Sequence, residues 1–448
     1  MEDIFKEMLN KMPGYNQGKE GLIEGESPIV YHEIGETSKS HLIYGMVKDV
    51  SPTALVITYS DTQANKLYED LSFFLGENIM YFPAQPTLYY FVDAHSPEIS
   101  IERIKVLRAL INRESKVIVA SIEAIMKKLL PIERYKNYWH IFKVGQIIEI
   151  EELQNFLIQS GYERVEEVES PGQYNIRGGI VDIYPIISDL PFRIEFFDNE
   201  IDSIRSFDTL TQRSIDKYTD IEVPPTKELI FLEIDKKDNL VKYEKEFSKN
   251  IKNELYLSSM EYDFVSLMDY FPKDFIIFLD QPHRIKERFD SVSSELQEDF
   301  KGLLEKEEVI PSDFEVFFPY YDLTKRMNRE RLCIFQTLIR RVDPFVPKKI
   351  LSLVSYPTHP FHGKLSLLVE EIAHWKKKGY SIIILSDTYK KGELLLENLV
   401  EMGIEGVFIG NPEKALVGGE IIILKGGIQR GVEYPEIKTI ILTEKEIF

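Results

Sequence analysis

Residues 170–207 read SPGQYNIRGGIVDIYPIISDLPFRIEFFDNEIDSIRSF, and they decide the fold of the middle of this chain. Apolar and polar side chains alternate along much of this stretch, and this period of two predicts strands with one buried face. Gly178 and Gly179 interrupt the alternation, so we expect a turn or bulge there. The same pattern of short alternating segments extends over residues 139–222 and predicts an inserted β-rich (α+β) domain of antiparallel strands.

The sequence on either side has a different pattern, in which apolar runs of strand length alternate with amphipathic segments of helix length. The run TALVITYS at residues 53–60 predicts a buried strand, and Asp61 is expected to cap the helix after it. A similar run, FIIFLD, occurs at residues 275–280. We therefore predict one α/β domain formed by residues 1–138 and 223–345, with a helical segment in its second part.

A further unit is expected at residues 350–448. It contains a helical segment, the apolar strand SIIILS at residues 381–386, an amphipathic helix that ends at Gly403, and three more apolar strands. This order predicts a small, separate α/β domain. The predicted fold class is thus a multidomain α/β chain.

The composition restricts the function. The chain has 448 residues and a formal net charge of −20, which argues against an extended duplex-binding surface, because phosphate binding needs clustered Lys and Arg. No long apolar stretch or leader is found, so we expect a cytoplasmic protein with no membrane partner. The only cysteine, Cys333, lies in an apolar run that we interpret as helical, and its thiol is expected to be buried. The histidines lack metal-ligand spacing, so no metal site is predicted.

One segment has part of the pattern of a phosphate loop. A working loop reads G-x-x-x-x-G-K-[ST], in which glycines let backbone N–H groups close around the phosphates. Residues 33–40 read EIGETSKS, which keeps Lys39 and Ser40 at the required offset. Glu33 and Ser38 stand where the two glycines belong. Both replacements oppose phosphate binding.

A second vestige of a nucleotide site is FIIFLDQPH at residues 275–283. Asp280 could still hold magnesium, but Gln281 replaces the carboxylate that activates water, and an amide is a poor general base. Glu36 adds a negative charge near the expected phosphate position. The first domain therefore resembles a RecA-like fold with a degenerate site, and we predict no catalytic residues, no bound nucleotide and no enzymatic activity.

The β-rich domain carries the candidate recognition residues. Alternation places Arg193 and Phe197 on the same face of one predicted strand, and Arg177 is expected to face solvent on another. An exposed aromatic side chain flanked by arginine is typical of an interface anchor. The sequence leaves one alternative open, in which Arg177 and Arg193 pair with Asp182 and Glu195 while Phe197 caps a neighbouring core.

Three segments in this domain carry a family resemblance: GYER at 161–164, SPGQYNIRGGIVDIYP at 170–185, and PFRIEFFDNEIDSIRSFDTLTQRSI at 191–215. They are similar to the domain shared by the repair protein UvrB and the bacterial transcription-repair coupling factors. The segment from Tyr81 to Leu110 is too short for the long aromatic hairpin of UvrB, and the final unit, which closes in LTEKEIF, resembles the coupling factor's third domain. The chain is therefore identified as the N-terminal, UvrB-like region of the coupling-factor family, ending where that family continues.

The resemblance implies a non-catalytic module of nucleotide excision repair that recruits UvrA by mimicking UvrB. Arg177, Arg193 and Phe197 match family positions that contact UvrA. The resemblance also implies that ATP, RNA polymerase and duplex DNA are bound only by further, absent domains, which form an ATP-dependent DNA translocase. The alternative is a UvrB-type ATP-dependent enzyme that binds damaged DNA. The role of residues 350–448 and the oligomeric state stay open.

Overall fold

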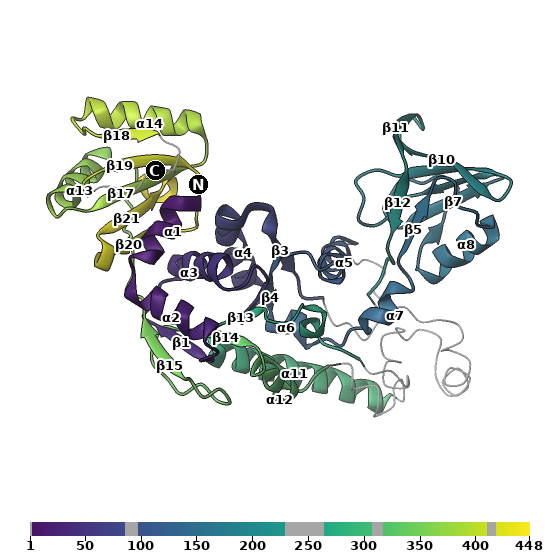
Figure 1. Cartoon of the computed structure of the whole chain (residues 1–448), viewed down its shortest axis with the longest axis horizontal. Coiled ribbons are helices and arrows are strands. Elements are labelled where there is room, and N and C mark those ends of the chain that lie inside the picture. The colour runs from purple at the N-terminus through teal and green to yellow at the C-terminus, as the bar shows by residue number, and fades with distance from the viewer. Residues whose placement is uncertain (1, 86–96, 229–263, 307–316, 410–417) are drawn as a thin grey trace.

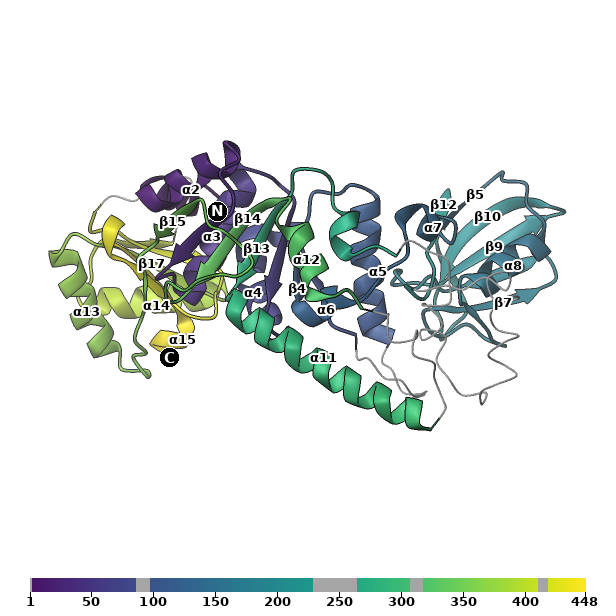
Figure 2. The same ribbon diagram turned by 90° about the horizontal axis from the view of Figure 1, so that it is seen from below.

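The computed structural model describes residues 2–85, 97–228, 264–306, 317–409 and 418–448, which form three bodies in a row (Figure 1). A parallel sheet forms the centre, the inserted β-rich body lies at one end, and the C-terminal body lies at the other. The view in Figure 2 shows the long helix α11 (Pro282–Glu305) running along the central body. The predicted multidomain α/β fold class is confirmed.

The central sheet contains seven described strands, all parallel, in the order β15-β1-β14-β13-β2-β4-β3. All residues of β2, β4 and β13 are buried, because these strands are nearly continuous apolar runs with helices on both faces. The strands are β1 (Ile29–His32), β2 (Ala54–Thr58), β3 (Ile79–Phe82), β4 (Val117–Ser121), β13 (Ile276–Asp280), β14 (Arg331–Gln336) and β15 (Lys349–Ser352).

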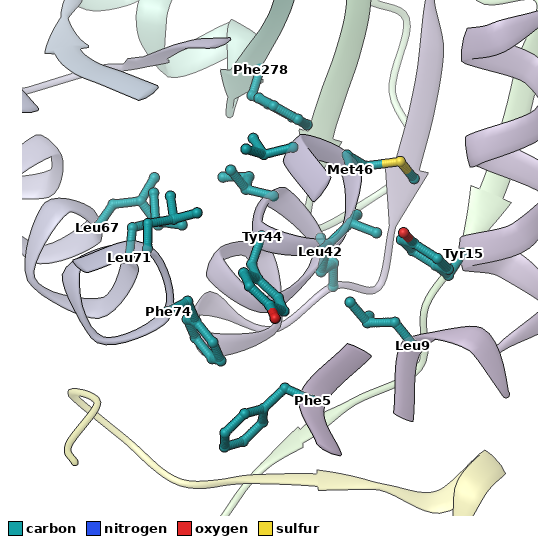
Figure 3. Packing of buried hydrophobic residues seen from close by; sticks show 14 of the residues in the cluster. Phe5, Leu9, Tyr15, Leu42, Tyr44, Met46, Leu67, Leu71, Phe74 and Phe278 are labelled. Carbon is teal, nitrogen blue, oxygen red and sulfur yellow. The ribbon is translucent and has the colours of Figure 1, made fainter. Parts of the chain in front are cut away.

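Two groups of helices cover the two faces of this sheet. One group shares a core with the side chains of Ala54 and Val56, and the other with those of Leu55 and Ile57, as strand alternation requires. Figure 3 shows the first core, in which apolar side chains from α1, α3, α4 and β13 meet. The first group is α1 (Glu2–Asn10), α2 (Pro13–Ile23), α3 (Glu36–Asp49) and α4 (Asp61–Leu75). The second is α5 (Pro97–Ile111), α6 (Ile122–Met126), α11 and α12 (Tyr320–Met327).

The inserted body is built on a six-stranded sheet in the order β11-β10-β9-β8-β7-β6, with a two-stranded sheet, β12-β5, beside it. Neighbouring strands are antiparallel except for β6 and β7. Helix α8 (Ile150–Gln159) buries Leu153 and Leu157 against the apolar face of the sheet. The strands are β5 (His140–Lys143), β6 (Glu163–Arg164), β7 (Gln173–Arg177), β8 (Ile180–Ile183), β9 (Phe192–Phe197), β10 (Glu200–Phe207), β11 (Ser214–Tyr218) and β12 (Asp220–Val223).

The C-terminal body has a six-stranded sheet in the order β16-β20-β21-β17-β19-β18. Strand β15 pairs with β1, so residues 349–352 belong to the central sheet and the C-terminal body follows them. The elements of this body are β16 (Tyr356–Pro357), α13 (Leu365–Lys377), β17 (Ser381–Ser386), α14 (Tyr389–Glu401), β18 (Val407–Ile409), β19 (Ile421–Lys425), β20 (Val432–Tyr434), β21 (Thr439–Thr443) and α15 (Glu444–Ile447).

The structure corrects two local predictions. Cys333 is buried in strand β14 and not in a helix, because a short apolar run in the middle of a sheet has no periodicity that separates strand from helix. Ser60 is the N-cap of α4, since its side chain accepts the Gln63 N–H, whereas Asp61 accepts the Ala84 N–H at 3.0 Å. The turn predicted at Gly178 is confirmed by its φ of +59°.

Residues 86–96, within the segment from Tyr81 to Leu110 that was compared with the UvrB hairpin, lie outside the described residues. Within the part of the chain that the structure describes, no helix combines the length and the apolar character needed to cross a membrane.

Candidate functional site

The degenerate phosphate loop, residues 33–40, leads from β1 into the first turns of α3. Lys39 is fully buried there. Its ammonium donates hydrogen bonds to the Glu36 carboxylate at 2.6 Å and to the Asp280 carboxylate, at the end of β13, at 2.7 Å. The charge that would bind a phosphate in a working loop is therefore paired with two carboxylates of the same chain.

Gln63 of α4 joins the two carboxylates, because its Nε2 donates to Glu36 at 2.7 Å and to Asp280 at 3.3 Å. Burial lowers the pKa of Lys39, but the attraction of Asp280 and Glu36 outweighs it, so this pKa is raised overall. Burial raises the pKa of the Asp280 carboxyl, against the opposing effect of the Lys39 charge. These four residues, named here the Lys39 cluster, hold a buried ion pair that depends on both partners.

The C-terminal body covers groups that a working loop would offer to a phosphate. The Gly35 N–H donates to the Ser355 hydroxyl at 3.0 Å, and the Thr37 hydroxyl donates to the Arg430 carbonyl at 2.7 Å. The Ser40 hydroxyl donates to the carbonyl of Thr37 at 2.9 Å, within its own helix. The start of a helix favours an anion, and at the start of α3 the Gly35 N–H and the hydroxyls of Thr37 and Ser40 already have partners within the protein.

The remaining nucleotide-motif residues have other surroundings. Gln281 is the N-cap of α11, with a φ of +60°, and its Nε2 donates to the Thr337 hydroxyl at 2.6 Å. The side chain of Glu33 is 62% exposed, with a carboxylate oxygen 3.5 Å from Nδ1 of His32. Ser38 is buried in α3. Of the predicted motif residues, Lys39 and Asp280 are therefore in direct contact, whereas the side chains of Glu33 and Gln281 have other neighbours.

Sequence reasoning identified Glu36 as a charge near the phosphate position but did not identify Gln63. Gln63 is an ordinary polar residue in the first turn of α4, and nothing in its neighbourhood in the sequence marks it as a partner of Asp280.

The second candidate site is the polar face of the inserted sheet, on the side away from the core beneath α8. The strand register places Asp182, Arg193 and Arg205 opposite one another on β8, β9 and β10. Arg193 donates two hydrogen bonds to Asp182, at 2.7 and 2.8 Å, and its guanidinium lies 4.6 Å from the centre of the Phe207 ring. The hydrogen bonds to Asp182 are the main cause of a raised Arg193 pKa. Arg193 is thus a half-buried, fixed cation.

Phe197 and Arg177 lie on the same face and are more accessible. Phe197 is 79% exposed, and Arg177 is exposed with its guanidinium donating to the carbonyl of Glu166. The register aligns Arg177 with Ile180 and Ile180 with Glu195, and residues paired in this way point to the same side of a sheet. Because Glu195 shares its side of β9 with Arg193 and Phe197, all three predicted residues lie on one face.

The alternative interpretation is correct for Arg193 only, which does pair with Asp182. Glu195 instead pairs with Arg205 at 3.3 Å and accepts the Ser203 hydroxyl at 2.6 Å. Phe197 is too exposed to cap a neighbouring core.

Two neighbours of this face were not predicted. Ile180 is 39% exposed, although it lies in the row between Arg177 and Glu195. Gln212 accepts hydrogen bonds from Arg193 through its side chain at 3.1 Å and its carbonyl at 3.4 Å. The exposure of Ile180 could have been predicted from the sequence, since this isoleucine falls on the polar side of the alternation that follows Gly179.

The inserted body indicates the class of protein. A family model described as the UvrB interaction domain matches residues 141–229, a span that includes the whole of the polar face. The chain therefore contains a domain similar to the one through which UvrB proteins interact.

Three relatives match the chain over 95% or more of its length. The chain is 30% identical to the transcription-repair-coupling factor of Bacillus subtilis (strain 168), over 100% of this chain and 39% of that protein. It is 27% identical to the factor of the same name from Staphylococcus epidermidis (strain RP62A) and 28% identical to that of Staphylococcus aureus (strain MRSA252), in each case over 95% of this chain and 38% of the relative. The predicted resemblance to transcription-repair coupling factors is confirmed, and the chain spans about two fifths of the length of these relatives.

Proposed function

We propose that this chain recruits UvrA to nucleotide excision repair in the cytoplasm, through the polar face of its inserted body. The observation that carries the proposal is the exposed Phe197, which shares that face with the guanidinium groups of Arg177 and Arg193 in a domain similar to the UvrB interaction domain. Aromatic and arginine side chains of this kind supply most of the binding energy in protein interfaces.

The test is a titration of purified UvrA with the whole chain and with Phe197→Ala. We expect UvrA affinity to fall by more than about tenfold, because truncation of an interface anchor commonly costs about 2 kcal/mol or more. The matched control is Ile158→Ala, since Ile158 is also an exposed apolar residue of this body but lies on α8, which packs on the opposite face of the sheet. Equal affinity for UvrA in both variants would contradict the proposal.

We also propose that the central body binds no ATP and catalyses no reaction. The Lys39 cluster supports this, because Glu36 and Asp280 already satisfy the ammonium that would hold a phosphate. Calorimetry with magnesium-ATP is the direct measurement, and we expect no saturable heat. Micromolar binding, or hydrolysis that is lost in Lys39→Ala, would favour the alternative of a UvrB-type ATP-dependent enzyme acting on damaged DNA.

The relatives also have long regions that this chain does not match. Because the relatives are more than twice as long as this chain, we propose that ATP-driven translocation and contacts with RNA polymerase and duplex DNA are carried by regions beyond the matched two fifths. In this proposal the chain supplies the repair-protein contact, and the other regions supply the movement on DNA.

A further inference from the structure

The C-terminal body has a cavity of about 610 Å³ between β16, the loop after it and α13. Its volume lies within the range of sites that bind small molecules or peptide side chains, about 300 to 1,000 Å³. It lies in the body at the opposite end of the molecule from the inserted sheet (Figure 1). An occupant of this cavity would therefore not compete for space with a partner on the polar face.

Aromatic and apolar side chains form the walls of the cavity. Tyr356 is 55% exposed, Leu367 is 44% exposed, and Trp375 of α13 is half-buried. Trp375 meets the buried Phe361 ring edge-to-face, with ring centres 6.5 Å apart. The segment between the walls is held in place, because the Thr358 N–H donates to the Gly431 carbonyl at 3.2 Å. The walls are thus largely preformed.

The charges that line the cavity are all negative. Glu370 and Glu371 come from α13, and Glu433 comes from β20, where it pairs with Tyr356 across the strands. No Lys or Arg lies among the lining residues that the structure describes, and the titratable lining groups besides the three glutamates are His359 and Tyr356. Such a site repels phosphate groups and attracts cations.

We propose that this cavity binds a short basic peptide segment of a partner protein, with an arginine side chain against the aromatic walls. A guanidinium stacks on Trp and Tyr rings and forms charge-assisted hydrogen bonds with carboxylates, which matches Trp375 and Tyr356 beside Glu370 and Glu371. The proposal gives the C-terminal body a recruiting role of its own, separate from the one proposed for the inserted body.

Trp375 allows a direct test, because the chain has only two tryptophans, Trp139 and Trp375. In a Trp139→Phe background, a capped peptide Ala-Arg-Leu-Arg-Ala is titrated while the fluorescence of Trp375 is recorded. The comparison peptide has citrulline at both arginine positions, which keeps the shape and removes the charge. We expect saturable binding of the arginine peptide and affinity at least about tenfold lower for the citrulline peptide.

Charge variants of the protein complete the test. Glu370→Gln/Glu371→Gln should weaken binding of the arginine peptide at least about tenfold and leave the thermal midpoint unchanged, since both residues are exposed. The control is Glu393→Gln/Glu397→Gln, which removes the same charge from exposed positions of α14 and should not alter binding. Equal binding of both peptides, equal binding by both double variants, or no saturable signal at millimolar peptide would overturn the proposal.

Discussion

Removing the buried ammonium of Lys39 should destabilise the central body strongly. Lys39→Met keeps most of the volume of the side chain but leaves the Asp280 carboxylate, which is 0% exposed, without its cation. Removing one partner of a buried pair commonly costs about 3 to 5 kcal/mol, because the remaining charge is neither solvated nor paired. For a domain of this size, that corresponds to a fall of roughly 6 to 20 °C in the unfolding midpoint.

The assay is urea unfolding followed by circular dichroism, with two further variants. Lys39→Met/Asp280→Leu removes both charges and should recover most of the loss, since an apolar pair is often as stable as a buried ion pair. Lys391→Met is the control, because Lys391 also pairs with two carboxylates, Asp387 and Glu444, but its side chain is 56% exposed. Its loss of stability should be much smaller than that of Lys39→Met, because an exposed ion pair contributes little.

One result would refute the reasoning about the Lys39 cluster. If Lys39→Met unfolds within about 0.5 kcal/mol of the unchanged protein, the ammonium is not the partner that keeps Asp280 satisfied. Lys39 would then be free to serve a ligand, and the proposed absence of ATP binding would lose its main support.

Three more predictions concern the pH response, the recognition face and DNA. Burial lowers the pKa of His41 to about 4, so the stability contributed by the neutral His41 ring is present above about pH 6.5 and is lost as the pH falls towards 4. Burial raises the pKa of Asp70 to about 6, so protonation of the Asp70 carboxyl adds stability as the pH falls below about 6. Asp70→Asn should therefore lose about 1 kcal/mol more stability between pH 7 and pH 5 than the unchanged chain, and identical pH profiles of urea unfolding would contradict this. Arg193→Ala should lower the thermal midpoint as well as UvrA affinity, because it breaks the pair with Asp182, whereas Phe197→Ala should lower affinity alone; an unchanged midpoint for Arg193→Ala would show that the pair adds no stability. Gel shifts at about 0.15 M salt should give duplex DNA dissociation constants no tighter than about 10⁻⁶ M with no preference for lesions, and selective sub-micromolar binding of a damaged duplex would argue against it.

The polar face of the inserted sheet could be predicted from the sequence because a strand has a fixed period. Arg193 and Phe197 are four residues apart on β9, so alternation alone places them on one side. The position of Arg177 depends on the register between β7, β8 and β9, which the turn at Gly178 helps to fix. The pairing of Arg193 with Asp182 could be named only as one of several options, because alternation does not give the register.

The Lys39 cluster could be predicted only in part. The motif comparison identified Lys39 and Asp280 because a nucleotide site requires those residue types at those places. It could not identify Gln63, or the hydrogen bond from Thr37 to the carbonyl of Arg430, which joins residues 393 positions apart. Contacts of this kind depend on how the bodies pack, and no local pattern in the sequence records that packing.

Ion pairs and a hydrogen bond at the junction between the inserted and central bodies are relevant to the proposed role of the polar face. Two arginines of α5 reach the chain as it returns from the inserted sheet: Arg103, fully buried, pairs with Glu228, and Arg108 pairs with Glu222 at 2.7 Å. Trp139, where the chain enters the inserted body, donates to the same Glu222 at 2.7 Å. The entry and the exit of the inserted body are therefore tied together and to one helix. If the central body binds no nucleotide, as proposed, no ligand cycle changes its shape, and these contacts at the junction would hold the polar face in one orientation. A constant orientation lowers the entropy lost when a partner binds, so the proposed absence of nucleotide binding and the proposed use of the polar face are physically compatible.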